Sequence, residues 1–137
     1  MRMPRKEPRS GAAAVELAVL LPFLVFLVVI AVDYGRIIYY SVIVENCARN
    51  GAVYAADPVA ASQSPYTSVQ AAALADAGNL NPPPAVSSVN GTDSSGNPFV
   101  DVTVTWTFQT ITNYPGVPQT TTISRTVRAP VAPLAPQ

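Results

Sequence analysis

Residues 12–32 read AAAVELAVLLPFLVFLVVIAV, an apolar stretch with one charge, Glu16, and one proline, Pro22. As an α-helix it would rise about 1.5 Å per residue and be about as long as the hydrocarbon core of a bilayer is thick. A cleaved signal peptide has a shorter apolar region, of about 7 to 15 residues, followed by a cleavage site of small residues. Here the uncharged run extends from Leu17 to Val32 and is followed by Asp-Tyr-Gly-Arg. We therefore predict a transmembrane helix over residues 12–32.

Basic side chains dominate the segment before this stretch. Residues 1–11 contain four of them against a single acid, Glu7: Arg2, Arg5, Lys6 and Arg9. Basic flanks of membrane helices stay in the cytoplasm, so we expect this leader to be cytoplasmic and the part after residue 32 to lie on the other side of the membrane. The whole chain has a formal net charge of +0, which gives no indication of a nucleic-acid partner.

The composition excludes most kinds of catalytic site. The 137 residues include no histidine and one cysteine, so one chain cannot form a Cys/His zinc cluster, a disulfide framework, a Ser/His/Asp triad or a Cys/His dyad. An acid–base pair would have to come from four aspartates without convergent spacing: Asp57, Asp76, Asp93 and Asp101. We expect no enzyme activity, no cofactor, no metal site and no small-molecule substrate.

The helix is predicted to continue beyond the apolar stretch. Small and apolar side chains recur every three or four residues on one face: Ile37, Tyr40, Ser41, Val44, Cys47, Ala48, Gly51 and Ala55. No strong helix breaker occurs before Asp57-Pro58, so we predict one helix over residues 12–56. Pro22 leaves the carbonyl of Ala18 without its donor and is the candidate kink.

Ion pairs at helical spacing support this helix without specifying it. Asp33 and Arg36 are three residues apart, and Glu45 and Arg49 are four apart. As exposed pairs each is worth about 0.2 to 0.5 kcal/mol. Cys47 is expected to be a small packed residue rather than an intermolecular disulfide partner.

Residues 57–128 are predicted to form a small α+β domain. A loop is expected after Pro58, then a short helix from an N-cap at Ser64 to Ala77, then a stiff spacer at Asn81-Pro-Pro-Pro. Alternating apolar and polar residues predict strands over 85–90, 99–109 and 119–128, with turns at 91–98 and 113–118. The predicted fold is α+β, a long helix packed on a small three-stranded antiparallel sheet.

The Pro-rich tail, residues 129–137, is expected to be extended and mobile. Asn90-Gly91-Thr92 matches a glycosylation triplet but is interpreted as loop sequence.

Two segments of the long helix carry a resemblance to a known family. Residues 9–24 read RSGAAAVELAVLLPFL, with Glu16 five residues after Gly11, and residues 32–56 read VDYGRIIYYSVIVENCARNGAVYAA. Together they resemble the type IV pilin-like class, and most closely the TadE-like proteins, which are pseudopilins or minor pilins of tight-adherence (Tad) pilus systems. Major pilins of these systems usually carry Tyr after the glutamate, where this chain has Leu17. That difference and the large C-terminal region favour a minor subunit.

The resemblance implies how the chain is processed and where it acts. A prepilin peptidase would cleave after Gly11, so that the mature chain begins at Ala12 and Glu16 becomes its fifth residue. The protein would be a single-pass protein of the bacterial inner membrane, with other pilin-like subunits and the pilus assembly platform as partners, and it would serve adherence or secretion. The alternative function is a permanently anchored periplasmic binding domain that retains residues 1–11.

Glu16 is the residue for which a functional role is most strongly expected. A carboxylate in a membrane helix costs about 2.5 to 3.5 kcal/mol on insertion scales. We hypothesise that it pairs with the new α-amino group at Ala12 of an adjacent subunit and sets the register between subunits. The alternative is that Glu16 stays hydrated near the cytoplasmic surface.

An aromatic and basic cluster lies where the apolar stretch ends. Its members, the candidate interface anchors, are Tyr34, Arg36, Tyr39 and Tyr40. Such residues are typical of the membrane–water interface. Packing against protein would explain them equally well.

Overall fold

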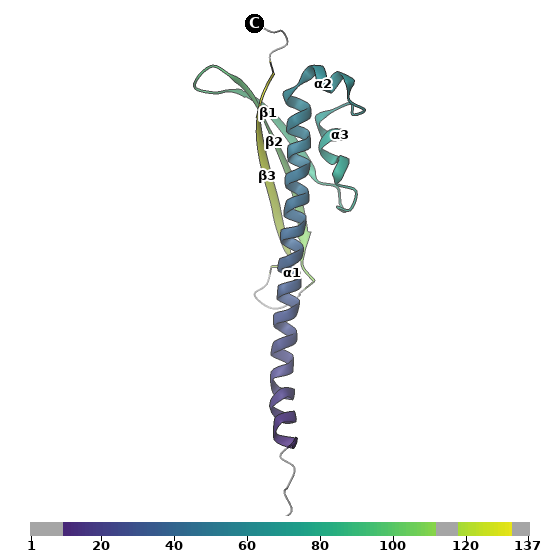
Figure 1. Ribbon diagram of the computed structural model, residues 1–137, viewed down its shortest axis with the longest axis vertical. Helices are drawn as coiled ribbons and strands as arrows, with labels where there is room; N and C mark the ends of the chain where they lie inside the picture. Colours follow the sequence, from purple (N-terminus) through teal and green to yellow (C-terminus); the bar gives the residue numbers. More distant parts are fainter. Residues whose placement is uncertain (1–9, 112–117, 133–137) are drawn as a thin grey trace, which may run out of the picture.

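The computed structural model describes residues 10–111 and 118–132. The predicted leader, up to residue 9, and residues 133–137 of the predicted tail lie outside this range, as does nearly all of the predicted turn 113–118. One long helix runs the length of the molecule, and a sheet and short helices pack beside its C-terminal half (Figure 1).

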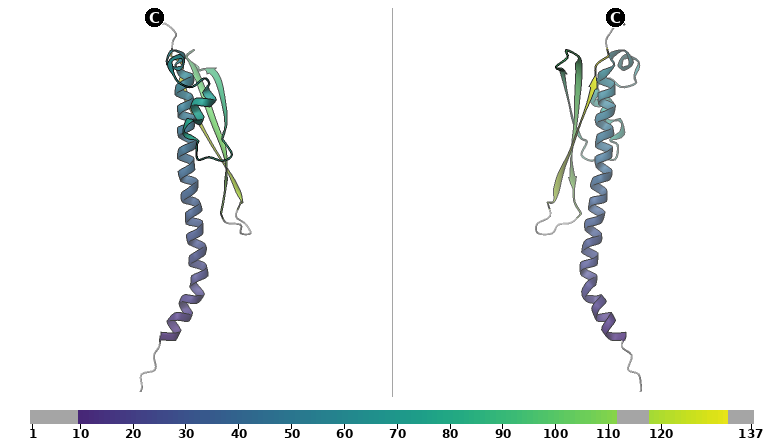
Figure 2. Two further views of the ribbon diagram at one scale, coloured as in Figure 1. Left: turned by 90° about the vertical axis from the view of Figure 1, so that its right-hand side faces the viewer. Right: turned by 60° about the vertical axis from the view of Figure 1, so that its left-hand side comes forward.

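Helix α1 spans Ser10–Ala56 and is 47 residues long, which confirms the predicted continuous helix. It ends at Ala56 because the next residue, Asp57, begins a separate helix. Pro22 lies inside α1, and Figure 2 shows that the helix bends in its N-terminal part. A proline within a helix removes one backbone hydrogen bond and commonly accompanies such a bend.

Two predictions for the segment after α1 are wrong. The expected loop after Pro58 is helix α2, Pro58–Gln63, because the Asp57 carboxylate accepts hydrogen bonds from the backbone N–H of Val59 at 3.0 Å and of Ala60 at 2.9 Å. Proline suits the first position of a helix, where its missing N–H is not needed. Ser64 closes α2 instead of starting the next helix.

The following helix therefore begins later than predicted. Helix α3 spans Val69–Ala73 and continues into a 3₁₀ turn, η1, at Leu74–Asp76. Its N-cap is Ser68, whose hydroxyl accepts a hydrogen bond from the N–H of Ala71 at 3.1 Å. Several serines in this region satisfy the N-cap preference, so the sequence did not distinguish among them.

The sheet confirms the predicted α+β class. Strands β1 (Ala85–Thr92), β2 (Pro98–Gln109) and β3 (Thr120–Pro130) pair antiparallel in the order β1-β2-β3 among the described residues. The Asn90-Gly91-Thr92 triplet lies in β1 rather than in a loop, with Gly91 opposite Phe99. A Cβ atom at Gly91 would lie 2.5 Å from the Phe99 ring, so glycine lets the ring cover this end of β1.

The first residues of the predicted mobile tail are ordered. Ala129 and Pro130 belong to β3. Beyond them, the N–H of Val131 donates to the carbonyl of Pro98 at 3.0 Å, and that of Ala132 donates to the carbonyl of Ala56 at 2.7 Å. The prediction for the tail is thus wrong for residues 129–132, because these hydrogen bonds fix the backbone beside β2 and the end of α1.

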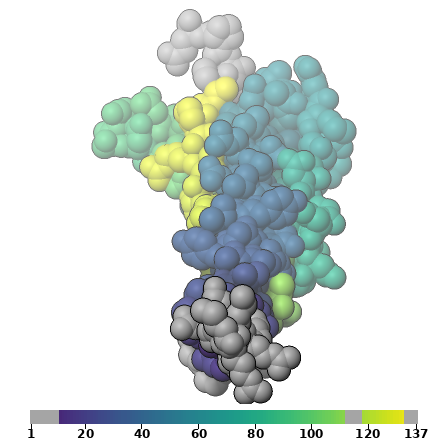
Figure 3. Space-filling view, turned by 60° about the horizontal axis from the view of Figure 1, so that its bottom comes forward, coloured from purple at the N-terminus to yellow at the C-terminus, as the bar shows by residue number. Residues whose placement is uncertain are grey.

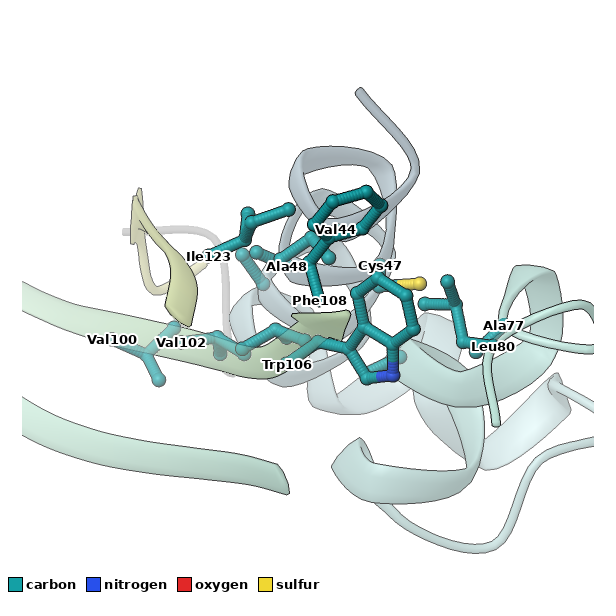
Figure 4. Packing of buried hydrophobic residues seen from close by; sticks show 13 residues of the cluster. Val44, Cys47, Ala48, Ala77, Leu80, Val100, Val102, Trp106, Phe108 and Ile123 are labelled. Atoms are coloured by element: carbon teal, nitrogen blue, oxygen red, sulfur yellow. The ribbon is translucent and has the colours of Figure 1, made fainter. Parts of the chain in front are cut away.

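The hydrophobic core lies between α1 and one face of the sheet. Alternate side chains of β2 are buried there: Val100, Val102, Val104, Trp106 and Phe108. Against them pack Val44, Cys47 and Ala48 of α1, with Ile123 of β3 and Leu80 at the sides (Figure 4). The small side chains of α1 let the helix approach the strands closely, as the predicted helical face requires.

Candidate assembly site on the long helix

The N-terminal half of α1 is apolar and uncovered. It is the one helix among the described residues that is long and apolar enough to cross a membrane, and none of its most apolar part is buried within the protein. Bulky side chains such as Leu17 and Phe23 are more than half exposed. An uncovered apolar surface of this extent marks contact with a membrane or with other proteins.

The predicted processing residues lie at the start of this half. Gly11 and Ala12 are exposed in the first turns of α1, and among the described residues nothing beyond the adjoining helix backbone comes within 4 Å of a Cβ atom built on Gly11. Glu16 is exposed one turn beyond Ala12, on the same side of the helix. It makes no hydrogen bond or ion pair with the residues that the structure describes. The site is open to a partner, and the roles of these residues remain predictions.

The four candidate interface anchors divide into two pairs. The Arg36 guanidinium lies 4.8 Å from the centre of the Phe108 ring, and the Tyr40 ring packs 4.9 Å from Trp106. Tyr34 and Tyr39 are exposed, at 66% and 58%. Arg36 and Tyr40 therefore pack on the sheet, whereas Tyr34 and Tyr39 are exposed, and the Tyr39 hydroxyl accepts a hydrogen bond from the Asn79 side chain at 3.3 Å.

Asp33 has a role that the sequence did not reveal. It is 5% exposed, so the prediction of an exposed ion pair with Arg36 is wrong, although the two side chains do meet at 3.0 Å. Both carboxylate oxygens also accept from the backbone N–H of Ile111, each at 3.1 Å. Asp33 thus ties the end of the apolar half of α1 to the chain just beyond β2. The one signal in the sequence is its position as the first charge after the apolar stretch.

Each of the four aspartates considered for an acid–base pair has a hydrogen-bond partner of its own. Asp57 caps α2, and the Asp76 carboxylate accepts from the Asn50 side chain at 2.7 Å. Asp93 accepts from the backbone N–H groups of its own turn, principally that of Asn97, and these bonds lower its pKa. The pKa of Asp101 is lowered by its two hydrogen bonds from Arg128, at 2.7 and 2.8 Å. No group of three or more His, Cys, Asp or Glu side chains that could hold a metal occurs within residues 10–111 and 118–132.

Cys47 is fully buried in the core, as predicted for a packed residue. Burial raises the pKa of its thiol, and the nearby charge of Asp76 raises it further. The thiol is therefore neutral and inaccessible in the folded protein.

A cleft lies at the far end of the molecule, between α1, α2 and α3. It has a volume of about 420 Å³, and Arg49, Tyr54, Tyr66 and Asp76 are among the residues that line it. The Tyr54 hydroxyl spans part of it by donating to the carbonyl of Tyr66 at 3.1 Å.

Residues 11–53 match the family model described as TadE-like protein. Over this segment the chain is similar to TadE-like proteins. The match includes Gly11, Glu16 and Asp33 and ends within α1, so the sheet and the short helices lie beyond it. No curated protein and no solved structure matches the chain.

The match confirms the resemblance drawn from the sequence. It supports a pilin-like protein associated with Tad pili, with pilin-like partners, and the apolar half of α1 fits anchoring in a membrane.

Proposed function

We propose that this protein is a minor pilin or pseudopilin of a Tad-type pilus. A prepilin peptidase removes residues 1–11, and the mature chain enters the pilus through the apolar half of α1. The chain acts as a structural subunit and not as an enzyme. The observation that carries the proposal is the TadE-like match on a helix whose apolar half is uncovered and presents Glu16 without a described partner.

The proposed assembly contact follows from the chemistry of these residues. Cleavage after Gly11 would create an α-amino cation at Ala12. An exposed carboxylate at Glu16 can accept a charge-assisted hydrogen bond from that cation on a neighbouring subunit. The pairing offsets the cost of placing both charges in an apolar bundle and favours one axial register between subunits. In this arrangement the sheet and the short helices lie outside the membrane.

The test is the intact mass and N-terminal sequence of the protein from native membranes and from sheared surface fractions of the bacterium. A chain that begins at Ala12, present in the sheared fraction, is the expected result. A chain that begins at Met1 in both fractions would contradict processing. A start beyond residue 30 would show that the apolar stretch is a cleaved signal peptide.

The second candidate function is a permanently anchored periplasmic binding domain. The cleft of about 420 Å³ between α1, α2 and α3 favours it, since its walls combine aromatic, amide and charged side chains. Retention of residues 1–11 together with absence from the sheared fraction would support this function over the first.

A further inference from the structure

A smaller cleft lies close to the end of the apolar half of α1. Its volume is about 190 Å³, and α1, β2 and the segment before β1 line it. Aromatic surface comes from Tyr40, Trp106 and Phe108, and the polar side chains in the wall are Arg36, Asn79, Asn81, Thr107 and Gln109. It combines a cation, neutral amides and aromatic rings in one concave surface.

The height of this cleft along α1 is set by helix geometry. Arg36 follows Val32, the last residue of the apolar stretch, by four positions, which is a rise of about 6 Å. The headgroup layer on each side of a bilayer core is about 5 to 8 Å thick. If the apolar half of α1 spans the membrane, Arg36 lies within that layer, and Tyr40 lies one turn farther out.

Arg36 lines the cleft and has donors that no described residue uses. One nitrogen of its guanidinium donates to Asp33 at 3.0 Å, and the side chain is 35% exposed. The other nitrogens make no hydrogen bond to residues 10–111 or 118–132. The Asp33 carboxylate, which also accepts from the N–H of Ile111, is not among the residues that line the cleft, so the guanidinium is the charged group in its wall. A guanidinium with free N–H groups binds phosphate oxygens well.

We propose that this cleft binds the phosphate of a membrane phospholipid, with Arg36 as its principal ligand. The proposal rests on the membrane anchoring in the proposed function. The amides of Asn81 and Gln109 complete the polar wall, and the rings of Tyr40 and Trp106, which lie farther from the membrane than Arg36, contact the head alcohol beyond the phosphate. A bound lipid would fix the height of the sheet above the membrane surface.

The test is native mass spectrometry of the full-length protein, released from detergent that contains phosphatidylglycerol or phosphatidylethanolamine. The wild-type protein is expected to retain one phospholipid of either kind. Arg36→Gln should retain about tenfold less, the scale for loss of a hydrogen-bonded charge. The matched control is Arg49→Gln, because Arg49 lies on the same helix in an exposed pair with Glu45, and it should retain lipid as the wild type does.

A second variant and a competitor separate lipid binding from misfolding and from binding of a free anion. Gln109→Ala leaves the contacts of Arg36 in place and should also reduce retention, so the proposal does not depend on the stability of one variant. Two results would overturn the proposal. One is that Arg36→Gln and Arg49→Gln lose the same amount of bound lipid. The other is that Arg36→Gln and Gln109→Ala retain as much lipid as the wild type. Displacement of the lipid by inorganic phosphate at equal concentration would identify a free-anion site instead. The same spectra give the mass of the chain, so processing at Gly11 is tested independently of lipid binding.

Discussion

The two halves of α1 differ in what covers them, although both carry many apolar side chains. Up to Val32 the side chains are mostly large and exposed, whereas beyond Asp33 one face is small, buried and packed on the sheet. Figure 3 shows the second half lying between β3 and the short helices, with part of its surface still open. Asp33 marks the boundary, since its carboxylate ties α1 to the chain beyond β2.

The comparison shows how one helix can meet two environments. In the first half, bulky aliphatic side chains can pack against lipid tails or against neighbouring helices. Small residues such as Ala48 and Gly51 suit a sheet, because they allow the backbone to approach strands closely. The processing and assembly residues expected from the sequence lie in the first half, and those that position the folded domain lie in the second.

The largest expected effect concerns the uncovered half. Glu16→Ala should leave the chain processed and folded but reduce its amount in the sheared pilus fraction to background, because the proposed pairing with Ala12 is lost. Immunoblots of membrane and sheared fractions measure this. Glu45→Ala, which removes an exposed acid from the second half, is the control and should leave incorporation unchanged. Normal incorporation of Glu16→Ala would disprove the assembly role.

A pair of phenylalanines separates the two environments. Phe108 is fully buried, whereas Phe23 in the apolar half is 58% exposed. Phe108→Ala should lower the free energy of unfolding of the folded domain by about 3 to 5 kcal/mol. Phe23→Ala should leave it unchanged, because Phe23 lies in the exposed, apolar half of α1. Urea unfolding of the full chain in detergent, followed by circular dichroism, compares the variants. An equal decrease in the free energy of unfolding in Phe108→Ala and Phe23→Ala would mean that the two halves of α1 unfold as one unit.

The boundary itself can be weakened at Asp33. Asp33→Asn keeps the shape of the side chain but removes its charge, and it should cost about 1 to 3 kcal/mol through weaker bonds to Arg36 and Ile111. Glu45→Gln disrupts an exposed pair at 3.4 Å and should change stability by less than about 0.5 kcal/mol. Hydrogen exchange at the amide of Ile111 should accelerate in the first variant only. Unchanged exchange there would show that Asp33 does not hold this strand end.

Two glycines of α1 should respond oppositely to alanine. At Gly51 a Cβ atom would lie 3.0 Å from both Ala73 Cβ and Val102 Cγ1, whereas at Gly35 it would meet nothing within 4 Å. Gly35→Ala should stabilise the helix by up to about 1 kcal/mol. Gly51→Ala gains the same helix propensity, but the new methyl group crowds the core. The free energy of unfolding should therefore fall by about 1 kcal/mol. Thermal melts of the full chain measure both, and stabilisation by Gly51→Ala would show that α3 moves aside easily.

The smallest effect is chemical and concerns Cys47. The pKa of this thiol is raised by burial, from an ordinary value of about 8.5. The stability that the neutral Cys47 thiol contributes is therefore fully present below the pKa of this thiol in the unfolded protein. It is lost as the pH rises through the higher pKa of the thiol in the folded protein. A thiol reagent should label native protein slowly at pH 8 and urea-unfolded protein rapidly. Rapid native labelling, or a non-reducing dimer absent in Cys47→Ser, would contradict the buried position.

Local sequence patterns were sufficient for the major elements. A long run without breakers predicted α1, and the alternation around Trp106 predicted β2, because period and length are properties of the chain itself. The helical pattern indicates Asp57 only as the end of α1, although aspartate before proline is also a favourable N-cap for a following helix. The strand ends and the first tail residues were underestimated, since their hydrogen bonds come from segments distant in the sequence.

Local sequence is enough to specify one long helix, an apolar half of about bilayer length, a glycine and a glutamate five residues apart near its start, and a small antiparallel sheet. These features depend on the order of neighbouring residues. The burial of Asp33, the packing of Arg36 and Tyr40 on the sheet, and the cleft beside them become visible only in the folded chain. The physical reason is that burial and hydrogen bonding arise between segments such as Asp33 and Ile111, which lie 78 residues apart in the chain, and local preference cannot specify such contacts.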